Sequence, residues 1–224
     1  MSTREPERSA AVEDYAKAIY ALETRSGAAV TTTALADRLE VTPASASGMV
    51  RKLDELGLVT HVPYKGVQLT PAGVRVALEV LRHHRLIELY LAEHLDVPWD
   101  RVHDEAEVLE HVLSEELEEL IAAKLGHPTR DPHGDPIPTR DLEIEEGPTE
   151  SLASLRPGTR GVFVRVSDSD PAMLRYLDER GIRPGDDFEV VDKQPFDGPS
   201  FVRFGAEEHV LGGALAAAMR VEVE

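Results

Sequence analysis

The 224-residue sequence contains no cysteine, and this absence excludes several kinds of site at once. Disulfides, thiolate zinc sites, iron–sulfur clusters and cysteine nucleophiles all depend on that residue. Long apolar runs are also missing, and the polar, mixed-charge residues 1–12 lack the apolar core of a signal peptide. We therefore expect a cytoplasmic protein without a membrane partner, in which any metal must be held by oxygen and nitrogen.

Positive charge is scarce as well, with 24 Lys and Arg against 42 Asp and Glu and a net charge of −18. Such a charge argues against nucleic-acid binding at first sight. The deficit is uneven, because residues 1–75 carry nine basic and nine acidic side chains, whereas the other 149 residues carry 15 and 33. A neutral N-terminal module on an acidic body can still bind DNA if its basic residues cluster.

The N-terminal pattern predicts a winged helix-turn-helix. Residues 12–24 and 34–39 have apolar side chains at helical spacing, and Pro43 opens a third helix that runs to about Leu56. Two short alternating segments, 58–62 and 67–70, flank a turn that contains Gly66 and predict a hairpin. A hairpin directly after two helices joined by a tight turn is a wing.

The third predicted helix begins with small and hydroxylated residues, which could enter a major groove. Its later basic residues and the basic wing tip would contact phosphates. A face of small residues can equally pack against another helix, but the basic groups favour DNA. The residues predicted to face DNA are Thr42, Ser45, Ser47, Arg51, Lys52, Tyr64 and Lys65.

Histidines and carboxylates recur at helical spacing later in the chain. A helix predicted over about 100–125 carries four of them at i, i+4, i+7 and i+8, and a helix over 70–95 carries a further pair at i, i+4. The alternative is a solvated acidic face with incidental histidines, but two such arrays among apolar residues favour one or two divalent metal sites. The residues are His103, Glu107, Glu110 and His111 on the later helix, and His84 and Glu88 on the earlier one.

The remaining sequence predicts a helical body and a small C-terminal barrel. The two helices have more apolar surface than one pair can bury, which indicates cover by a second subunit. A Pro-rich crossing loop follows at 127–138 and an acidic linker at 141–148. From Ser151 onward, short alternating runs predict an antiparallel barrel, with a helix inserted at about 171–181 and a short buried helical turn within 211–219.

This order of modules resembles the diphtheria-toxin-repressor family of metal-dependent repressors over essentially the whole chain. The resemblance is most specific at VEDYAKAIYALE (12–23), RHHRLIELYL (82–91), VHDEAEVLEHVLSEELE (102–118) and HPTRDPHGDPIP (127–138). It is strongest toward the manganese-responsive branch in its three-domain form. The resemblance implies an α+β fold with a winged helix-turn-helix DNA-binding domain at 1–75, a helical metal-binding and dimerisation domain at 76–147, and an SH3-like, FeoA-type barrel at 148–224.

The resemblance also implies a homodimer whose metal-loaded form binds a palindromic operator in double-stranded DNA and represses metal-uptake genes. It implies two metal sites per subunit. One site takes Asp14, Glu107, Glu110 and His111. The other takes His84, Glu88 and His103 with help from the barrel, where Asp168 and Asp170 are the candidates.

The metal implied by this resemblance is Mn²⁺. Asp14 and Glu107 stand where iron-responsive members have Met and Cys, and carboxylates with imidazole suit a hard ion. Lys17 stands where the two-domain manganese sensors have a further carboxylate, which favours two separated sites. Iron(II) and zinc also fit on affinity alone, so an iron- or zinc-responsive repressor stays the alternative.

A di-metal oxidase or hydrolase is the alternative from another class. The spacing Glu107-x-x-Glu110-His111 differs from the H-x-x-E-H motif of zinc proteases at its first position. The paired Glu-x-x-His motifs of di-iron enzymes do not occur. We therefore predict a regulator and not an enzyme.

Overall fold

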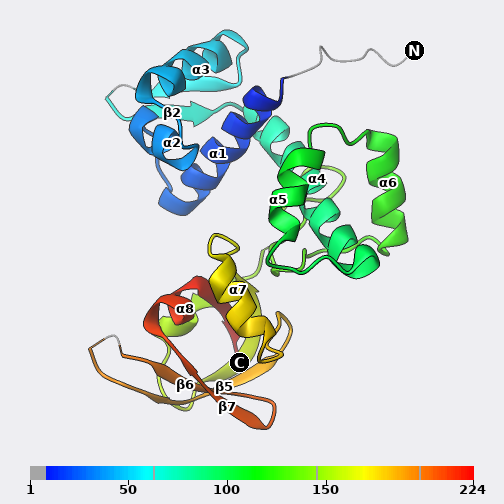
Figure 1. The fold of residues 1–224 in the computed structure, drawn as a ribbon. Coiled ribbons are helices and arrows are strands. Elements are labelled where there is room, and N and C mark those ends of the chain that lie inside the picture. Colours follow the sequence, from blue (N-terminus) through cyan, green and yellow to red (C-terminus); the bar gives the residue numbers. More distant parts are fainter. Residues whose placement is uncertain (1–8, 63, 145, 197) are drawn as a thin grey trace. The chain divides into compact units, whose positions relative to one another are not determined.

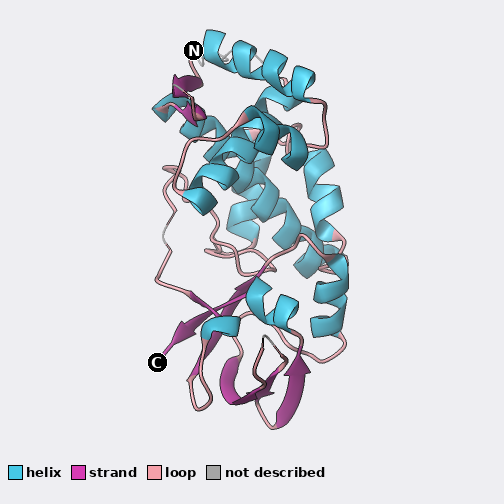
Figure 2. Cartoon of the chain, turned by 90° about the vertical axis from the view of Figure 1, so that its left-hand side faces the viewer, coloured by secondary structure: helices cyan, strands magenta, loops and turns pink. Residues whose placement is uncertain are grey.

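The structure is a computed structural model that describes residues 9–62, 64–144, 146–196 and 198–224. Helices form most of the regular structure before residue 125, and most strands follow residue 149 (Figure 1, Figure 2). This confirms the predicted α+β class. The chain divides into two compact units: Met1–His83 with Glu110–Leu113 and Pro138–Glu143, and His84–Leu109 with Ser114–Ile137 and Ile144–Glu224.

The first unit contains the winged helix, whose helices begin where the sequence supplies caps. The hydroxyl oxygens of Thr31 and Thr42 accept hydrogen bonds from the amides of Ala34 and Ser45, which an isolated first turn would leave unpaired. Pro43 occupies the first turn of its helix at no cost in hydrogen bonds. The elements are α1 (Ala10–Ser26), α2 (Thr32–Arg38), α3 (Pro43–Glu55), β1 (Val59–Val62) and β2 (Gly66–Leu69).

The face of α3 that packs inward follows helical spacing. Ala46, Val50 and Leu53 are buried at i, i+4 and i+7, in one core with residues of α1, α2 and the hairpin. The start of α3 leaves Ser45 and Ser47 exposed. The inward face thus fixes which side of α3 is available to DNA.

The hairpin has the predicted antiparallel pairing, from Val59 opposite Leu69 to Val62 opposite Gly66. Pro63, in the predicted turn, lies outside the described residues. The wing is therefore a short two-stranded ladder whose tip includes the exposed residues Tyr64 and Lys65.

Two anchors outside the ladder hold the second wing strand. The Glu23 carboxylate of α1 accepts a hydrogen bond of 3.0 Å from the Leu69 amide. Val30 and Val67 exchange backbone hydrogen bonds of 2.8 and 2.9 Å. Gly66 has a φ of 119°, and a Cβ at this position would lie 1.9 Å from the Val30 carbonyl oxygen. Only glycine permits this approach of the strand.

The long helix α4 (Pro71–Leu95) matches the prediction for 70–95, but the single helix expected over 100–125 is wrong. Two helices, α5 (Val102–Leu109) and α6 (Glu115–Lys124), occupy that range. Ser114 caps α6 by accepting from the Leu117 amide, and acidic side chains in the first turn of α6 complement the helix dipole. Glu110 and His111 consequently follow the end of α5 and do not share one helix face with His103.

The predicted crossing loop at 127–138 is tied together by backbone and side-chain hydrogen bonds. Asp131 accepts from the amides of His133 and Asp135, both at 2.9 Å. Val166 of the C-terminal sheet donates to the His133 carbonyl at 2.9 Å. The loop therefore has a defined conformation against the sheet within the second unit.

The C-terminal part of the second unit is an antiparallel sheet in the order β3-β8-β4-β5-β6-β7. Its core includes Phe163, Val202, Leu211 and Val221, and along β6 buried residues alternate with partly exposed ones. Trp99, from the segment after α4, is buried in the same core. The elements are β3 (Glu150–Ser151), the 3₁₀ turn η1 (Leu152–Ser154), β4 (Arg160–Val166), α7 (Pro171–Asp178), β5 (Asp187–Lys193), β6 (Ser200–Phe204), β7 (Glu207–Leu211), α8 (Gly213–Ala218) and β8 (Met219–Val223).

The sequence predicts strands at about 161–166, 187–191, 200–204 and 220–223, and the two outermost strands of this sheet, β3 and β7, are not among them. β3 has only two residues, and β7 begins with exposed charged residues, so neither shows the alternation of the central strands. The buried helical turn predicted within 211–219 is confirmed as α8, and the inserted helix ends at Asp178, earlier than predicted. No described helix is both long and apolar enough to cross a membrane.

Candidate metal centres

The first unit brings Asp14, Glu110 and His111 together as a group of potential metal ligands. Asp14 comes from α1, and the other two follow the end of α5. The His111 Nε2 atom lies 2.9 Å from Asp14 Oδ1 and 3.5 Å from Glu110 Oε1. The Glu110 side chain is fully buried. We refer to these three residues as the α1 cluster.

Two further side chains of α1 contact the α1 cluster. Glu13 Oε2 lies 2.7 Å from His111 Nδ1, and a carboxylate at this nitrogen orients the ring so that Nε2 faces Asp14 and Glu110. Lys17 Nζ donates to Glu110 Oε1 at 2.6 Å. Glu13 was not among the ligands or contacts predicted from the sequence. In the sequence, only its position next to the predicted ligand Asp14 could have suggested that Glu13 lies at the site.

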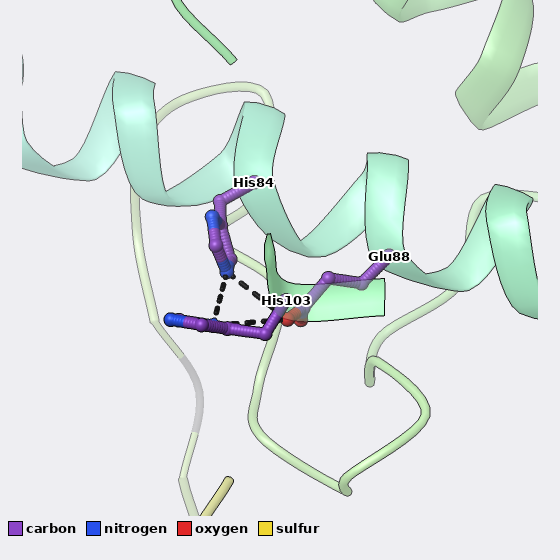
Figure 3. Close-up of side chains that lie close together, drawn as sticks. All are labelled: His84, Glu88 and His103. Carbon is purple, nitrogen blue, oxygen red and sulfur yellow. Dashed lines mark hydrogen bonds and ion pairs between the residues drawn. The ribbon is translucent and has the colours of Figure 1, made fainter. Parts of the chain in front are cut away.

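The second unit brings together His84, Glu88 and His103 (Figure 3). His84 and Glu88 are one turn apart on α4, and His103 lies in the first turn of α5. His84 Nε2 lies 3.0 Å from Glu88 Oε1 and 3.2 Å from His103 Nδ1, and His103 Nδ1 lies 3.4 Å from the same Glu88 oxygen. We refer to these three residues as the α4 cluster.

The barrel adds Asp168 to the α4 cluster, since Asp168 Oδ2 lies 3.1 Å from His103 Nδ1. Asp170, the other candidate, has a different role in the structure. Its side chain accepts from the Ala172 amide and caps α7. The geometry thus distinguishes the two aspartates that the sequence left open.

The crossing loop supplies two potential ligands that the sequence analysis missed, Asp131 and His133, which form a buried group with Glu88. His133 Nδ1 lies 3.7 Å from Glu88 Oε2, too far for a hydrogen bond, and among the described residues it has no hydrogen-bond partner. Its other nitrogen, Nε2, pairs with the Trp99 carbonyl at 2.7 Å. In the sequence, the close spacing of Asp131 and His133 around one proline could have suggested a pair of ligands in the loop.

The backbone after His133 also requires glycine. Gly134 has a φ of 90°, and a Cβ there would lie 2.0 Å from the Val164 carbonyl oxygen. The close approach of this turn to β4 therefore positions His133 beside Glu88.

Glu107, predicted to act with Asp14, contacts residues of the α4 cluster. One of its oxygens lies 3.7 Å from His103 Nε2 and 3.8 Å from His84 Nδ1. Its membership of the site with Asp14 stays a prediction.

Neighbouring charges shift the pKa values of His103, His133 and Glu88. The carboxylates of Asp168 and Glu88 raise the pKa of His103 to about 10. Burial lowers the pKa of His133, but Glu88 and Asp131 outweigh it and raise that pKa to about 9. Burial alone would raise the pKa of Glu88, yet the surrounding histidines hold it well below the usual range.

The donor sets fit a hard divalent ion. Each group offers only nitrogen and oxygen atoms within 4.8 Å of one another, and the buried, unpaired Nδ1 of His133 is a ligand atom in need of a partner. Glu88 and Glu110 are both buried, unlike the carboxylates of a solvated acidic face. These observations support the metal interpretation over incidental histidines.

Metal binding at the α4 cluster should release protons. Because the pKa values of His103 and His133 are raised to about 10 and about 9, both rings are protonated at neutral pH without metal, and an ion must displace the protons of any ring that it binds. We expect release of about two protons per ion and an affinity that increases as the pH rises toward 10. Calorimetry in buffers of different ionisation enthalpy measures the release. His103→Ala should reduce it, and a buffer-independent heat would contradict the prediction.

The predicted DNA-facing residues all lie on exposed parts of α3, its N-terminus and the wing. The Ser47 hydroxyl donates to the Pro43 carbonyl at 2.8 Å, and Arg51 Nε donates to the Ser47 carbonyl at 3.4 Å. Tyr64 adopts a φ of 61°. The structure thus leaves this face available, and its contacts with DNA stay a prediction.

Three family descriptions match consecutive parts of the chain. The iron dependent repressor N-terminal DNA binding domain matches residues 8–67, and the iron dependent repressor metal binding and dimerisation domain matches residues 70–139. The FeoA domain matches residues 150–223. The predicted succession of DNA-binding, dimerisation and SH3-like domains is confirmed.

The winged helix and the two ligand clusters define a class, namely DNA-binding proteins that depend on a divalent metal. The diphtheria toxin repressor of Corynebacterium diphtheriae is 31% identical over 226 residues, with 94% of this chain and 96% of that protein covered. The iron-dependent repressor IdeR of Mycobacterium tuberculosis is 31% identical over 223 residues with the same coverage. The chain belongs to the diphtheria-toxin-repressor family of metal-dependent transcriptional repressors.

Solved structures connect the chain to manganese regulators. A manganese-dependent transcriptional repressor in complex with manganese is 42% identical, has a TM-score of 0.88, and matches over 95% of this chain and 100% of that one. The manganese regulator SloR is 29% identical with a TM-score of 0.75, covering 95% of this chain and 98% of its own. The resemblance to the manganese-responsive branch is confirmed, and family membership supports a regulator over an enzyme.

Proposed function

We propose that this chain is a manganese-responsive repressor that binds a palindromic operator as a metal-loaded homodimer and represses genes for metal uptake. Each subunit would hold two ions, one at the α1 cluster and one at the α4 cluster. The observation that carries the proposal is the α1 cluster, a set of two carboxylates and an imidazole that joins the first helix of the winged helix to residues 110 and 111. Its hard donors suit Mn²⁺.

The proposed metal switch depends on the two parts of the chain, α1 and residues 110–111, that supply the ligands of the α1 cluster. Without metal, the carboxylates of Asp14 and Glu110 repel each other, and the pairing of Glu110 with Lys17 offsets only part of that repulsion. A divalent ion between them would reverse that repulsion and hold α1 in one position. In a symmetric dimer this fixes the separation of the two α3 helices, which must match half-sites one helical repeat apart.

An ion at the α4 cluster would connect the C-terminal domain to the helical body. Asp168 from the barrel and His133 from the crossing loop converge on Glu88 and His103 of the helical body. An ion there would stabilise the packing of these elements within the second unit. Asp131 is a further candidate ligand, and Asp170 is left to cap α7.

The dimer would form through exposed apolar side chains of the helical body. Val108 and Leu109 on α5, and Leu117 and Leu120 on α6, are exposed to between 39% and 70%. A second copy would remove this surface from water. DNA would be contacted by the exposed start of α3, by Arg51 and Lys52, and by the wing tip.

Operator binding titrated against several divalent metals tests the proposal. The wild-type protein and DNA carrying palindromic candidate sites are mixed anaerobically with Mn²⁺, Fe²⁺, Zn²⁺ or a chelator. Operator occupancy that is highest with Mn²⁺ when each metal is held at its cellular free concentration would support it, because Mn²⁺ is intrinsically the weakest binder of the series. Equal occupancy with chelator and with Mn²⁺ would refute a metal switch.

An iron response is the second candidate function, because the curated relatives at 31% identity are named as iron-dependent or diphtheria toxin repressors. The same titration separates the two. Activation by Fe²⁺ at physiological concentrations, without activation by Mn²⁺, would favour iron.

A further inference from the structure

Lys17 occupies a position that none of the ligand assignments explains. Its ammonium donates to Glu110 Oε1 at 2.6 Å, and His111 Nε2 approaches the same oxygen at 3.5 Å. The Glu110 side chain is fully buried, whereas 18% of the Lys17 side chain is exposed. The ammonium of Lys17 and the imidazole of His111 therefore both approach one buried oxygen.

A buried carboxylate requires a counter-charge, and Lys17 supplies one in the absence of metal. Removing one partner of such a pair leaves an uncompensated charge and destabilises the fold. A metal ion at the α1 cluster would supply the same compensation more strongly. The ion and the ammonium would then compete for Glu110 Oε1 and repel each other.

The formal charges fit this competition. Glu13, Asp14 and Glu110 with Lys17 carry a net charge of −2, which one divalent ion neutralises. Without Lys17 the same carboxylates carry −3 and attract cations more strongly. The ammonium thus lowers the attraction of the α1 cluster for any cation.

We infer that Lys17 is a resident cation of the α1 cluster, which stabilises Glu110 in the metal-free protein and raises the free metal concentration at which the cluster fills. This inference rests on the proposed metal switch and adds the residue that sets its threshold. Lys17 acts on the ion through Glu110 and is a positioning residue, not a ligand.

The test measures direct binding of Mn²⁺ to the protein. The electron paramagnetic resonance signal of free Mn²⁺ reports how much of the ion stays unbound. Full-length protein carrying His103→Ala serves as the background, so that the α4 cluster contributes little. In that background Lys17→Gln should bind Mn²⁺ about tenfold more tightly, since it removes the repulsion but keeps a hydrogen-bond donor. Its metal-free form should unfold at a lower temperature, and Mn²⁺ should restore much of the difference.

Two control variants separate charge from shape. Lys17→Arg keeps the charge and should bind Mn²⁺ like the parent protein. Arg25→Gln removes a positive charge from an exposed position on the same helix and should also leave the affinity unchanged. An unchanged or weaker affinity in Lys17→Gln would overturn the inference.

A measurement on the wild-type protein avoids any dependence on the folding of variants. Mass spectrometry follows the acetylation of Lys17 by acetic anhydride, with the exposed Lys52 and Lys65 as internal references. Mn²⁺ should accelerate modification of Lys17 relative to the references, because the ion weakens its pairing with Glu110. An unchanged relative rate despite bound Mn²⁺ would also overturn the inference. Failure of Mn²⁺ to bind any of these proteins would instead refute the proposed function.

Discussion

Replacing His111 with alanine is expected to abolish metal-stimulated operator binding, with a loss of about 100-fold in affinity at saturating Mn²⁺. His111 Nε2 is the one nitrogen ligand atom of the α1 cluster, 2.9 Å from Asp14 Oδ1. Without it, an ion keeps only carboxylates that repel one another. Glu110→Gln should have a similar effect, because it removes charge from the shared carboxylate while an amide oxygen can still accept from Lys17.

The measurement is operator affinity with Mn²⁺ and with chelator, together with oligomeric state and circular dichroism. Glu93→Gln and His94→Ala are matched controls, since both residues are exposed at the end of α4. They should retain the full response to Mn²⁺. A His111→Ala protein that still gains operator affinity with Mn²⁺ would remove the α1 cluster from the switch.

Local chemistry explains which parts of the fold the sequence could predict. The winged helix depends on caps at Thr31 and Thr42, on Pro43, and on apolar spacing in α3, all of which act within a few residues. The boundary between α5 and α6 was missed because the cap at Ser114 interrupts an apolar pattern that continues on both sides. Periodicity over a long window then favours one helix, while a single capping hydrogen bond with an acidic first turn favours two.

Among the candidate ligands too, contacts within a helix were predictable from the sequence, whereas contacts between distant segments were not. His84 and Glu88 are one helical turn apart, so spacing alone predicted that they meet. The contacts of His111 with Glu13 and of Lys17 with Glu110 join residues 98 and 93 positions apart. Only the tertiary packing brings these side chains together. His133 was missed for the same reason, since its contact with Glu88 depends on the path of the crossing loop over the sheet.

Gly66→Ala is expected to cause the largest loss of stability among single methyl additions in the winged helix. Its φ of 119° is disfavoured for any residue with a side chain, and the added Cβ would lie 1.9 Å from the Val30 carbonyl oxygen. The second wing strand would have to separate from Val30, which breaks both hydrogen bonds between Val30 and Val67. We expect a cost of more than about 3 kcal/mol, at the severe end of single substitutions.

Gly57→Ala provides the matched control for this prediction. Gly57 also has a positive φ, 71°, but a Cβ there would meet nothing within 4 Å. It should therefore cost only the backbone strain of about 1–2 kcal/mol. Urea unfolding of metal-free protein measures both costs, and operator affinity at saturating Mn²⁺ shows whether displacing the wing also impairs DNA binding. Equal destabilisation by the two substitutions would show that the wing strand can move away from Val30 at little cost, and that the approach of Gly66 to Val30 does not hold the wing in place.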